Sequence, residues 1–247
     1  EMKVLKFGGT SVGSAQRMKD VAKLIVGEKN LIVLSAMSGT TNSLVEISDY
    51  LYKKNPDGAN EIINKLSQKY FGHIEELYAT EEYKAKAREL VTFHFDHIRS
   101  FTKDLFTLFE EKVVLAQGEL ISTGMMNLYL KELGVNSVLL PALDFMRTDK
   151  NAEPDPVYIK EKLTRLLEEN AEADLYITQG YICRNAYGEI DNLQRGGSDY
   201  TASLIGAAIK AEEIQIWTDI DGMHNNDPRF VKGTSPVRHL HFEEAAE

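Results

Sequence analysis

Short apolar stretches that alternate with helical ones constrain the fold of this chain more than any other feature. The apolar stretches at residues 3–7, 31–34, 138–140, 175–177 and 213–219 predict strands, and helical spacing recurs between most of them. This alternation predicts an α/β fold on a mostly parallel sheet. Ligands of such sheets bind at the carboxyl ends of the strands, so the polar residues that follow each strand are the first candidates for a site.

The first strand is followed by a glycine loop and then by a helix that we expect to begin after the capping residue Ser14. The backbone amides of Gly8 and Gly9 suit a phosphate, and Lys6 at the end of the strand adds a positive charge. The spacing fits neither the GxxxxGK[ST] loop nor the GxGxxG loop. The alternative is a solvated lysine before a flexible turn.

A polar loop follows the second strand, with the sequence Ser35-Ala36-Met37-Ser38-Gly39-Thr40-Thr41-Asn42. Its hydroxyl groups stand where a parallel sheet collects ligands. Serine, threonine and asparagine are also common capping residues, and a helix is expected at 42–54. A binding loop and a simple cap therefore both remain open.

The range 56–112 has no strand pattern, many charged residues and apolar residues at helical spacing, which predicts a helical insertion packed beside the sheet. His94 and His97 lie one helical turn apart and could share a metal, but no third ligand is evident, and the sequence identifies no metal site. The aromatic residues of this range are expected in the core: Phe93, Phe95, Phe101, Phe106 and Phe109.

Glu119 stands in a helical stretch at 113–130, directly after Gly118. It either offsets a helix dipole or, if it faces the cleft, supplies a counter-charge for a ligand ammonium group. A further amphipathic helix is expected at 157–168.

The stretch from Gln194 to Ala202 is the strongest candidate for a ligand site. Arg195 offers two parallel donors to a carboxylate, and Gly196 and Gly197 allow close approach of the backbone. Ser198 is expected to cap a helix whose positive end attracts an anion. Asp199 beside such a site makes sense if the ligand also carries an ammonium group or a metal. The alternative is a Gly-Gly turn with an acid in the first helical turn.

The last predicted strand ends in Thr218 and Asp219, and a turn-rich loop at 220–229 follows it. A nucleotide would lie at this position in an α/β sheet, and Arg229 could reach a phosphate. The alternative for Asp227-Pro228 is a plain turn.

The length and net charge of the chain indicate its number of domains and exclude some classes of partner. The 247 residues suit one large α/β domain, and the net charge of −10 argues against a nucleic-acid or anionic-membrane partner. No apolar run is long enough for a membrane span and no signal peptide is evident, so a cytoplasmic location is expected. Cys183 is the single cysteine, which excludes an internal disulfide and a cysteine-based zinc site.

Five motifs in this order closely resemble those of aspartokinases, which belong to the amino-acid kinase superfamily. They lie at residues 6–12, 35–42, 118–120, 195–199 and 217–229, and the resemblance spans nearly the whole chain. It implies a three-layer α/β/α sandwich of the amino-acid kinase (carbamate kinase-like) type. Residues 1–190 would mainly bind the amino acid, and residues 191–247 would form a nucleotide-binding part that is incomplete at its C-terminal end.

The resemblance also implies transfer of the γ-phosphoryl group of MgATP to the β-carboxylate of L-aspartate, the first step of lysine, threonine and methionine biosynthesis. Arg195 would bind the α-carboxylate, Glu119 and Asp199 would face the ammonium group, and Thr41 would lie near the β-carboxylate. Lys6, with Gly8 and Gly9, would contact the transferred phosphoryl group, and Lys6 and Asp199 are the predicted catalytic pair. The other implied contacts are Ser35 and Ser198 to the substrate, and Thr218, Asp219, His224 and Arg229 to the nucleotide.

Two departures from the family pattern qualify this interpretation. His224 stands where relatives usually have tyrosine, and the sequence ends before a segment that in aspartokinases carries a further lysine and before their regulatory ACT domains. We therefore expect a catalytic domain cut from a longer, homo-oligomeric protein. Two alternatives remain: another kinase of the superfamily, acting on acetylglutamate, glutamate or a carbamate, and a sensor that binds an amino acid or nucleotide without catalysis.

Overall fold

The computed structural model describes residues 2–103, 105–194, 196–219 and 234–240. Within them a six-stranded sheet has the order β3-β4-β2-β1-β7-β8. Its first five strands are parallel, and only β8 runs antiparallel to its neighbour. The strands are β1 Val4–Phe7, β2 Leu31–Leu34, β3 Ser137–Leu139, β4 Leu175–Gln179, β7 Ile214–Asp219 and β8 Thr234–Leu240. The predicted mostly parallel sheet is confirmed.

The strand register determines which loops meet. β1 lies at the centre of the pairing, with Phe7 opposite both Leu34 of β2 and Trp217 of β7. The glycine loop, the polar loop after β2 and the end of β7 therefore emerge at one edge of the sheet. This is the carboxyl edge, where parallel sheets bind their ligands.

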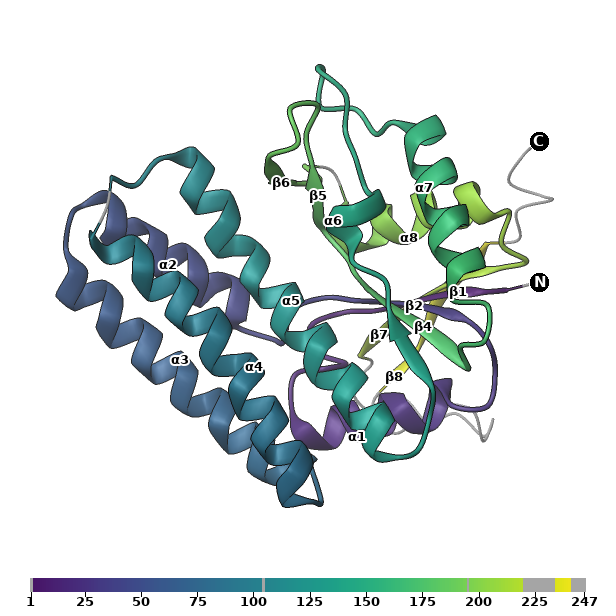
Figure 1. The fold of residues 1–247 in the computed structure, drawn as a ribbon, viewed down its shortest axis with the longest axis horizontal. Helices are drawn as coiled ribbons and strands as arrows, with labels where there is room; N and C mark the ends of the chain where they lie inside the picture. Colours follow the sequence, from purple (N-terminus) through teal and green to yellow (C-terminus); the bar gives the residue numbers. More distant parts are fainter. Residues whose placement is uncertain (1, 104, 195, 220–233, 241–247) are drawn as a thin grey trace.

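Helices cover both faces of the sheet, and alternate strand residues point into two cores (Figure 1). Leu5 and Phe7 pack with α1 and α5, whereas Val4 packs with α7 and α8. This period of two is what a strand buried on both faces requires. The covering helices are α1 Ala15–Ile25, α5 Leu108–Glu132, the short α6 Ala142–Phe145, α7 Pro156–Glu169 and α8 Gly197–Ile209. The three-layer sandwich is thus confirmed.

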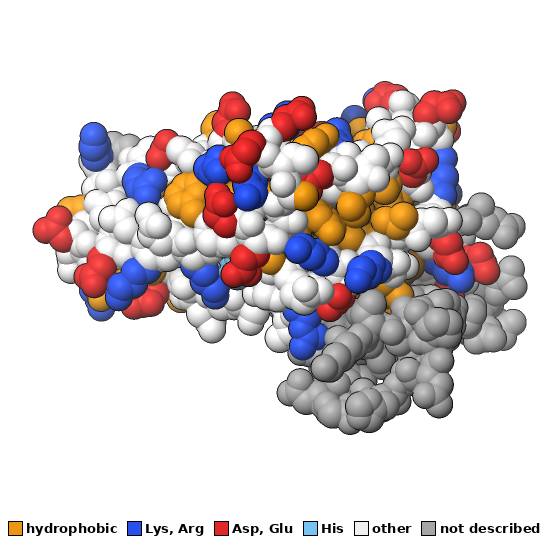
Figure 2. All heavy atoms as spheres, turned by 90° about the horizontal axis from the view of Figure 1, so that it is seen from below, with side chains coloured by type: hydrophobic (Ala, Val, Ile, Leu, Met, Phe, Trp, Pro, Cys, Tyr) orange, Lys and Arg blue, Asp and Glu red, His pale blue; other side chains and the backbone are white. Residues whose placement is uncertain are grey.

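The predicted helical insertion consists of α3 Pro56–Leu77, α4 Glu81–Ser100 and the 3₁₀ turn η1 Phe101–Lys103. These pack with α2 Thr40–Tyr52 and the first half of α5 into a bundle that projects from one side of the sheet (Figure 1). α5 begins at Leu108, inside the predicted insertion, so one helix joins the bundle to the sheet. Figure 2 shows basic and acidic side chains mixed over the visible face of this bundle.

Some local predictions are wrong. Phe95 and Phe106 are buried, but Phe93 is 66% exposed and Phe109 is 49% exposed, so neither belongs to the buried core. The sequence patterns also missed the antiparallel hairpin of β5 Ile182–Arg184 and β6 Ile190–Asn192. Among the described helices, none combines the length and the apolar character that crossing a bilayer requires.

Candidate active site

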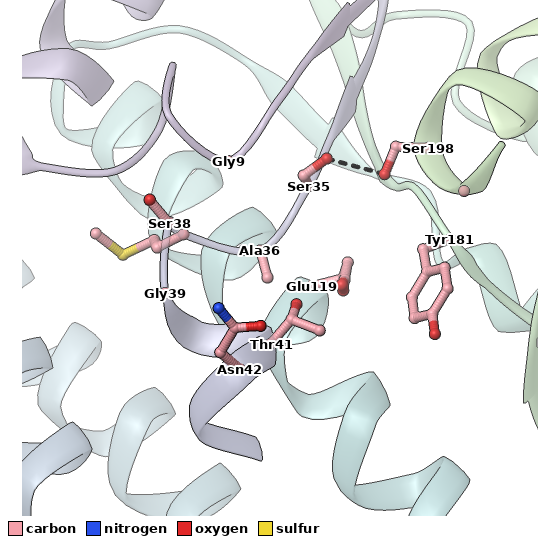
Figure 3. Close-up of a pocket in the computed structure, with 12 residues that line it drawn as sticks. Gly9, Ser35, Ala36, Ser38, Gly39, Thr41, Asn42, Glu119, Tyr181 and Ser198 are labelled. Atoms are coloured by element: carbon pink, nitrogen blue, oxygen red, sulfur yellow. Dashed lines mark hydrogen bonds between the residues drawn. The ribbon is translucent and has the colours of Figure 1, made fainter. Parts of the chain in front are cut away.

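A cavity of about 420 Å³ opens at the carboxyl edge of the sheet (Figure 3). It lies where the loops after β1, β2 and β4 meet the first turns of α2 and α8 and the middle of α5. Its volume suits a small metabolite. The described residues that line it are Gly9, Ser35, Ala36, Met37, Ser38, Gly39, Thr41, Asn42, Glu119, Tyr181, Gly197 and Ser198.

Two glycines bring the walls of this cavity together. A Cβ atom on Gly118 would lie 2.9 Å from the Cβ of Ala36, so the missing side chain lets α5 approach the loop after β2. A Cβ atom on Gly180 would lie 2.6 Å from the Cβ of Ser198, so β4 and α8 also meet closely only because this residue is glycine. The close approach of α5 places Glu119 at the cavity wall.

Glu119 is a buried acid that lacks a cationic partner in the described part of the chain. It is 3% exposed, and its Oε2 atom makes no hydrogen bond to any described residue. Burial raises the pKa of its carboxyl group to about 8, partly offset by a backbone hydrogen bond. A carboxylate removed from water in this way is costly unless a cation joins it. The site therefore favours a ligand with an ammonium group.

Two helix N-termini face the same cavity. α2 begins after Gly39 (φ 84°) and α8 begins after Gly196 (φ 70°), and neither N-cap residue provides a side-chain cap. Free amides and the helix dipole make both ends attractive to anions. The prediction that Ser198 caps α8 is wrong, because the N-cap residue is Gly196, two residues earlier. The hydroxyl of Ser35 instead donates to Ser198 Oγ at 2.9 Å.

Lys6 forms an ion pair beside the cavity. Its Nζ atom lies 2.9 Å from Oδ1 of Asp199. The side chain of Lys6 is 14% exposed and that of Asp199 is 43% exposed. Nζ also lies 3.3 Å from the position of a Cβ atom on Gly8, so the ammonium group sits over the glycine loop. This loop leads from Lys6 directly into the cavity.

The structure brings most of the predicted site residues to one region. Gly9, Ser35, Thr41, Glu119 and Ser198 line the cavity, and the ion pair of Lys6 with Asp199 lies next to it, beside Gly8. The backbone of Thr218 and Asp219 ends β7 at the same edge of the sheet. Arg195, His224 and Arg229 lie outside the described residues.

Tyr181 is a cavity residue that the sequence did not single out. Its backbone has φ 72°, a region that side-chain-bearing residues seldom adopt, and its amide donates to Thr201 Oγ1 at 2.9 Å. Burial raises the pKa of its phenol, and the charge of Glu119 adds to the effect. Its position just after the buried strand β4 is the sequence feature that could have identified it as a site residue.

His94 contacts α5 close to Glu119, through a hydrogen bond to Gln117. It is buried on α4, and its Nδ1 atom donates to Oε1 of Gln117 at 2.6 Å. The amide nitrogen of Gln117 then donates to the carbonyl of Val113 at 2.9 Å. No group of three or more His, Cys, Asp or Glu within the described ranges is arranged to hold a metal, so the shared-metal hypothesis for His94 and His97 gains no third ligand.

Comparisons with known proteins converge on one family. The Amino acid kinase family matches residues 1–247. Lysine-sensitive aspartokinase 3 of Escherichia coli is 32% identical over 255 residues, which cover 100% of this chain and 55% of that protein. Aspartokinase 3, chloroplastic, of Arabidopsis thaliana is 33% identical over 264 residues, covering 99% of this chain and 45% of that protein.

The fold agrees with these sequence matches. The solved structure of E. coli aspartokinase III in complex with aspartate and ADP superimposes with a TM-score of 0.77 at 31% identity. The superposition covers 93% of this chain and 52% of that one. This chain therefore spans about half the length of the relatives it matches.

Proposed function

The chain belongs to the amino acid kinase family, and on that premise we propose that its cavity is the substrate site of an aspartate kinase. The enzyme transfers the γ-phosphoryl group of ATP to the β-carboxylate of L-aspartate and forms 4-phospho-L-aspartate. Similar proteins named aspartokinases, one of them bound to aspartate and ADP, support this choice of substrates.

The buried carboxylate of Glu119 between two helix N-termini is the observation that carries the proposal. Aspartate has one ammonium group and two carboxylates, so its charges complement one acidic wall and two anion-binding helix ends. We assign the ammonium group to Glu119 and the β-carboxylate to the first turn of α2, at Thr41. Arg195, outside the described residues, is assigned to the α-carboxylate.

The reaction needs little from the protein beyond positioning and charge. An oxygen of the β-carboxylate forms a bond to the γ-phosphorus, the bond from that phosphorus to the bridging oxygen breaks, and ADP leaves. A carboxylate with a pKa near 4 is already ionised at neutral pH, so no general base is required. The obstacle is repulsion between anions, which the ammonium group of Lys6 and the amides of Gly8 and Gly9 reduce.

Asp199 holds Lys6 in place before the nucleotide arrives. Thr218 and Asp219, with His224 and Arg229 outside the described residues, are assigned to the nucleotide. ATP would enter with Mg²⁺, which usually keeps several waters and binds through phosphates and one or two carboxylates. Asp199 lies at the carboxyl edge of the sheet and could provide one of these carboxylates. Mg²⁺ would neutralise part of the phosphate charge.

Substrates of other kinases in the superfamily fit the cavity less well. Acetylglutamate and carbamates carry no ammonium group that could pair with the buried carboxyl group of Glu119. Glutamate carries the same charges as aspartate but is one methylene longer. A sensor without catalysis would not need Lys6 over the glycine loop.

Release of ADP in the presence of aspartate and MgATP, with hydroxylamine as a trap for the acyl phosphate, tests the proposal. The expected product is aspartyl hydroxamate, formed faster with aspartate than with glutamate or acetylglutamate. Binding of aspartate without any hydroxamate would support the sensor instead. Faster turnover of another acceptor would replace aspartate as the substrate.

Three further assignments belong to the whole protein and stay predictions. They are the division into an amino-acid part at 1–190 and a nucleotide part at 191–247, the homo-oligomeric state, and the cytoplasmic location. Both predicted parts contribute strands to the same sheet, because β7 of the nucleotide part pairs directly with β1 of the amino-acid part.

A further inference from the structure

The helical insertion places a cation close to Gly39, a residue that lines the cavity. α3 is fixed to the first turn of α2 by a hydrogen bond of 2.6 Å between the hydroxyls of Tyr70 and Thr40, and both residues are buried. Lys69 precedes Tyr70 on α3. Its Nζ atom lies 3.8 Å from the position of a Cβ atom on Gly39. Gly39 is the N-cap residue of α2 and lines the cavity.

Lys69 has no carboxylate of its own in the described part of the chain. Lys65, one turn earlier on α3, pairs with Glu61 at 3.6 Å, but no described acid lies within ion-pair distance of Lys69. Its neighbour one turn later, His73, is a half-buried imidazole whose pKa is lowered by burial first and by Lys69 second. The neighbourhood therefore leaves the charge of Lys69 available to a ligand.

The location of Lys69 near Gly39 indicates which group of the ligand its ammonium group would contact. Gly39 and Thr41 belong to the anion-attracting start of α2, whereas the acid of the cavity, Glu119, belongs to α5. We propose that Lys69 recognises the side-chain carboxylate of the substrate and so favours a dicarboxylic amino acid over its amide. The inference rests on the proposed function and adds a specificity residue that α3 supplies from outside the sheet.

Aspartate binding to this chain and to Lys69→Gln, measured by calorimetry, tests the inference. The expected loss is about two- to fivefold at low ionic strength, because the lysine is exposed and water screens its charge. The loss disappears at high ionic strength, and Lys69→Arg restores binding. Lys65→Gln is the matched control: it removes an equal charge from the same helix and leaves aspartate binding unchanged.

The outcomes separate this inference from the proposed function. Absence of aspartate binding by the unmodified chain would overturn the proposed function, and this inference with it. Normal binding by Lys69→Gln, or a loss equal to that of Lys65→Gln, would overturn the inference alone. A raised KM for ATP with unchanged aspartate binding would assign the lysine to the nucleotide and would also overturn it.

Discussion

The two sides of the site carry their negative charge in opposite ways. On α5, Glu119 is 3% exposed and has no cationic partner among the described residues. On α8, the side chain of Asp199 is 43% exposed and lies 2.9 Å from the ammonium group of Lys6. The carboxyl group of Glu119 depends on the ligand for a cation that favours its ionised form, whereas that of Asp199 already has a cation from the protein.

This difference explains how one small cavity can serve two tasks. A buried, unpaired acid discriminates strongly between ligands, because only a cation removes its desolvation cost. An exposed ion pair contributes little to stability and can rearrange when a phosphate arrives. We therefore assign recognition of the ammonium group to Glu119 on α5, and phosphoryl chemistry to the ion pair of Lys6 with Asp199.

Loss of Lys6 should produce the largest effect. Lys6→Met is expected to lower kcat by about two to three orders of magnitude, because a preorganised charge next to the transferred group is removed. Aspartate affinity should change less than about threefold. Steady-state kinetics and aspartate titration check both parts, and normal turnover would remove the catalytic assignment.

Loss of the Glu119 charge should produce the second largest effect. It should act on the KM for aspartate and not on kcat. Glu119→Gln is expected to raise the KM for aspartate about thirtyfold, because a buried charge pair with the ammonium group is lost. The KM for ATP should stay nearly unchanged. An equal rise in both constants would show that the two sides of the site are not separate.

The pH dependence of unfolding provides a third test, which concerns stability and not kinetics. The folded-state pKa of Glu119 is raised to about 8 from an ordinary value of 4.5, so its contribution is fully present below pH 4.5 and is lost as the pH rises through about 8. Denaturant unfolding of Glu119→Gln should therefore lack a decline of about 1 kcal/mol per pH unit that the unmodified chain shows in this window. Parallel curves for the two proteins would contradict the raised pKa.

Asp199→Asn should have the smallest effect on stability. The pair with Lys6 is partly exposed, so the free energy of unfolding is expected to fall by less than about 1 kcal/mol. Turnover should fall about tenfold, because Lys6 loses the partner that orients it. A large loss of stability with unchanged turnover would make the pair structural.

Sequence patterns predicted the parts of the fold that depend on local periodicity. Five apolar stretches predicted the five parallel strands, and the rule for carboxyl edges predicted that the loops at Gly8 and Ser35 would meet. Glycine spacing could not show that Gly118 allows α5 to approach Ala36, so whether Glu119 faced the cavity stayed open.

The remaining errors come from tertiary context. Ser198 has the chemistry of a capping residue, but Gly196 adopts the left-handed conformation that starts α8, and the serine hydroxyl bonds to Ser35. Phe93 and Phe109 follow helical spacing, but both are largely exposed. In both cases the outcome depends on residues distant in sequence, which a local sequence pattern does not identify.

Proton release on aspartate binding tests the central claim most directly. With a pKa of about 8, Glu119 is mostly protonated at pH 7 in the empty cavity, and an ammonium group beside it favours the ionised form. Calorimetric titrations at pH 7 in buffers of different ionisation enthalpy should reveal release of about one proton per aspartate bound by the unmodified chain, and none by Glu119→Gln. Equal proton release by the two proteins would contradict the assignment of the ammonium group to Glu119, and release by neither would contradict the raised pKa.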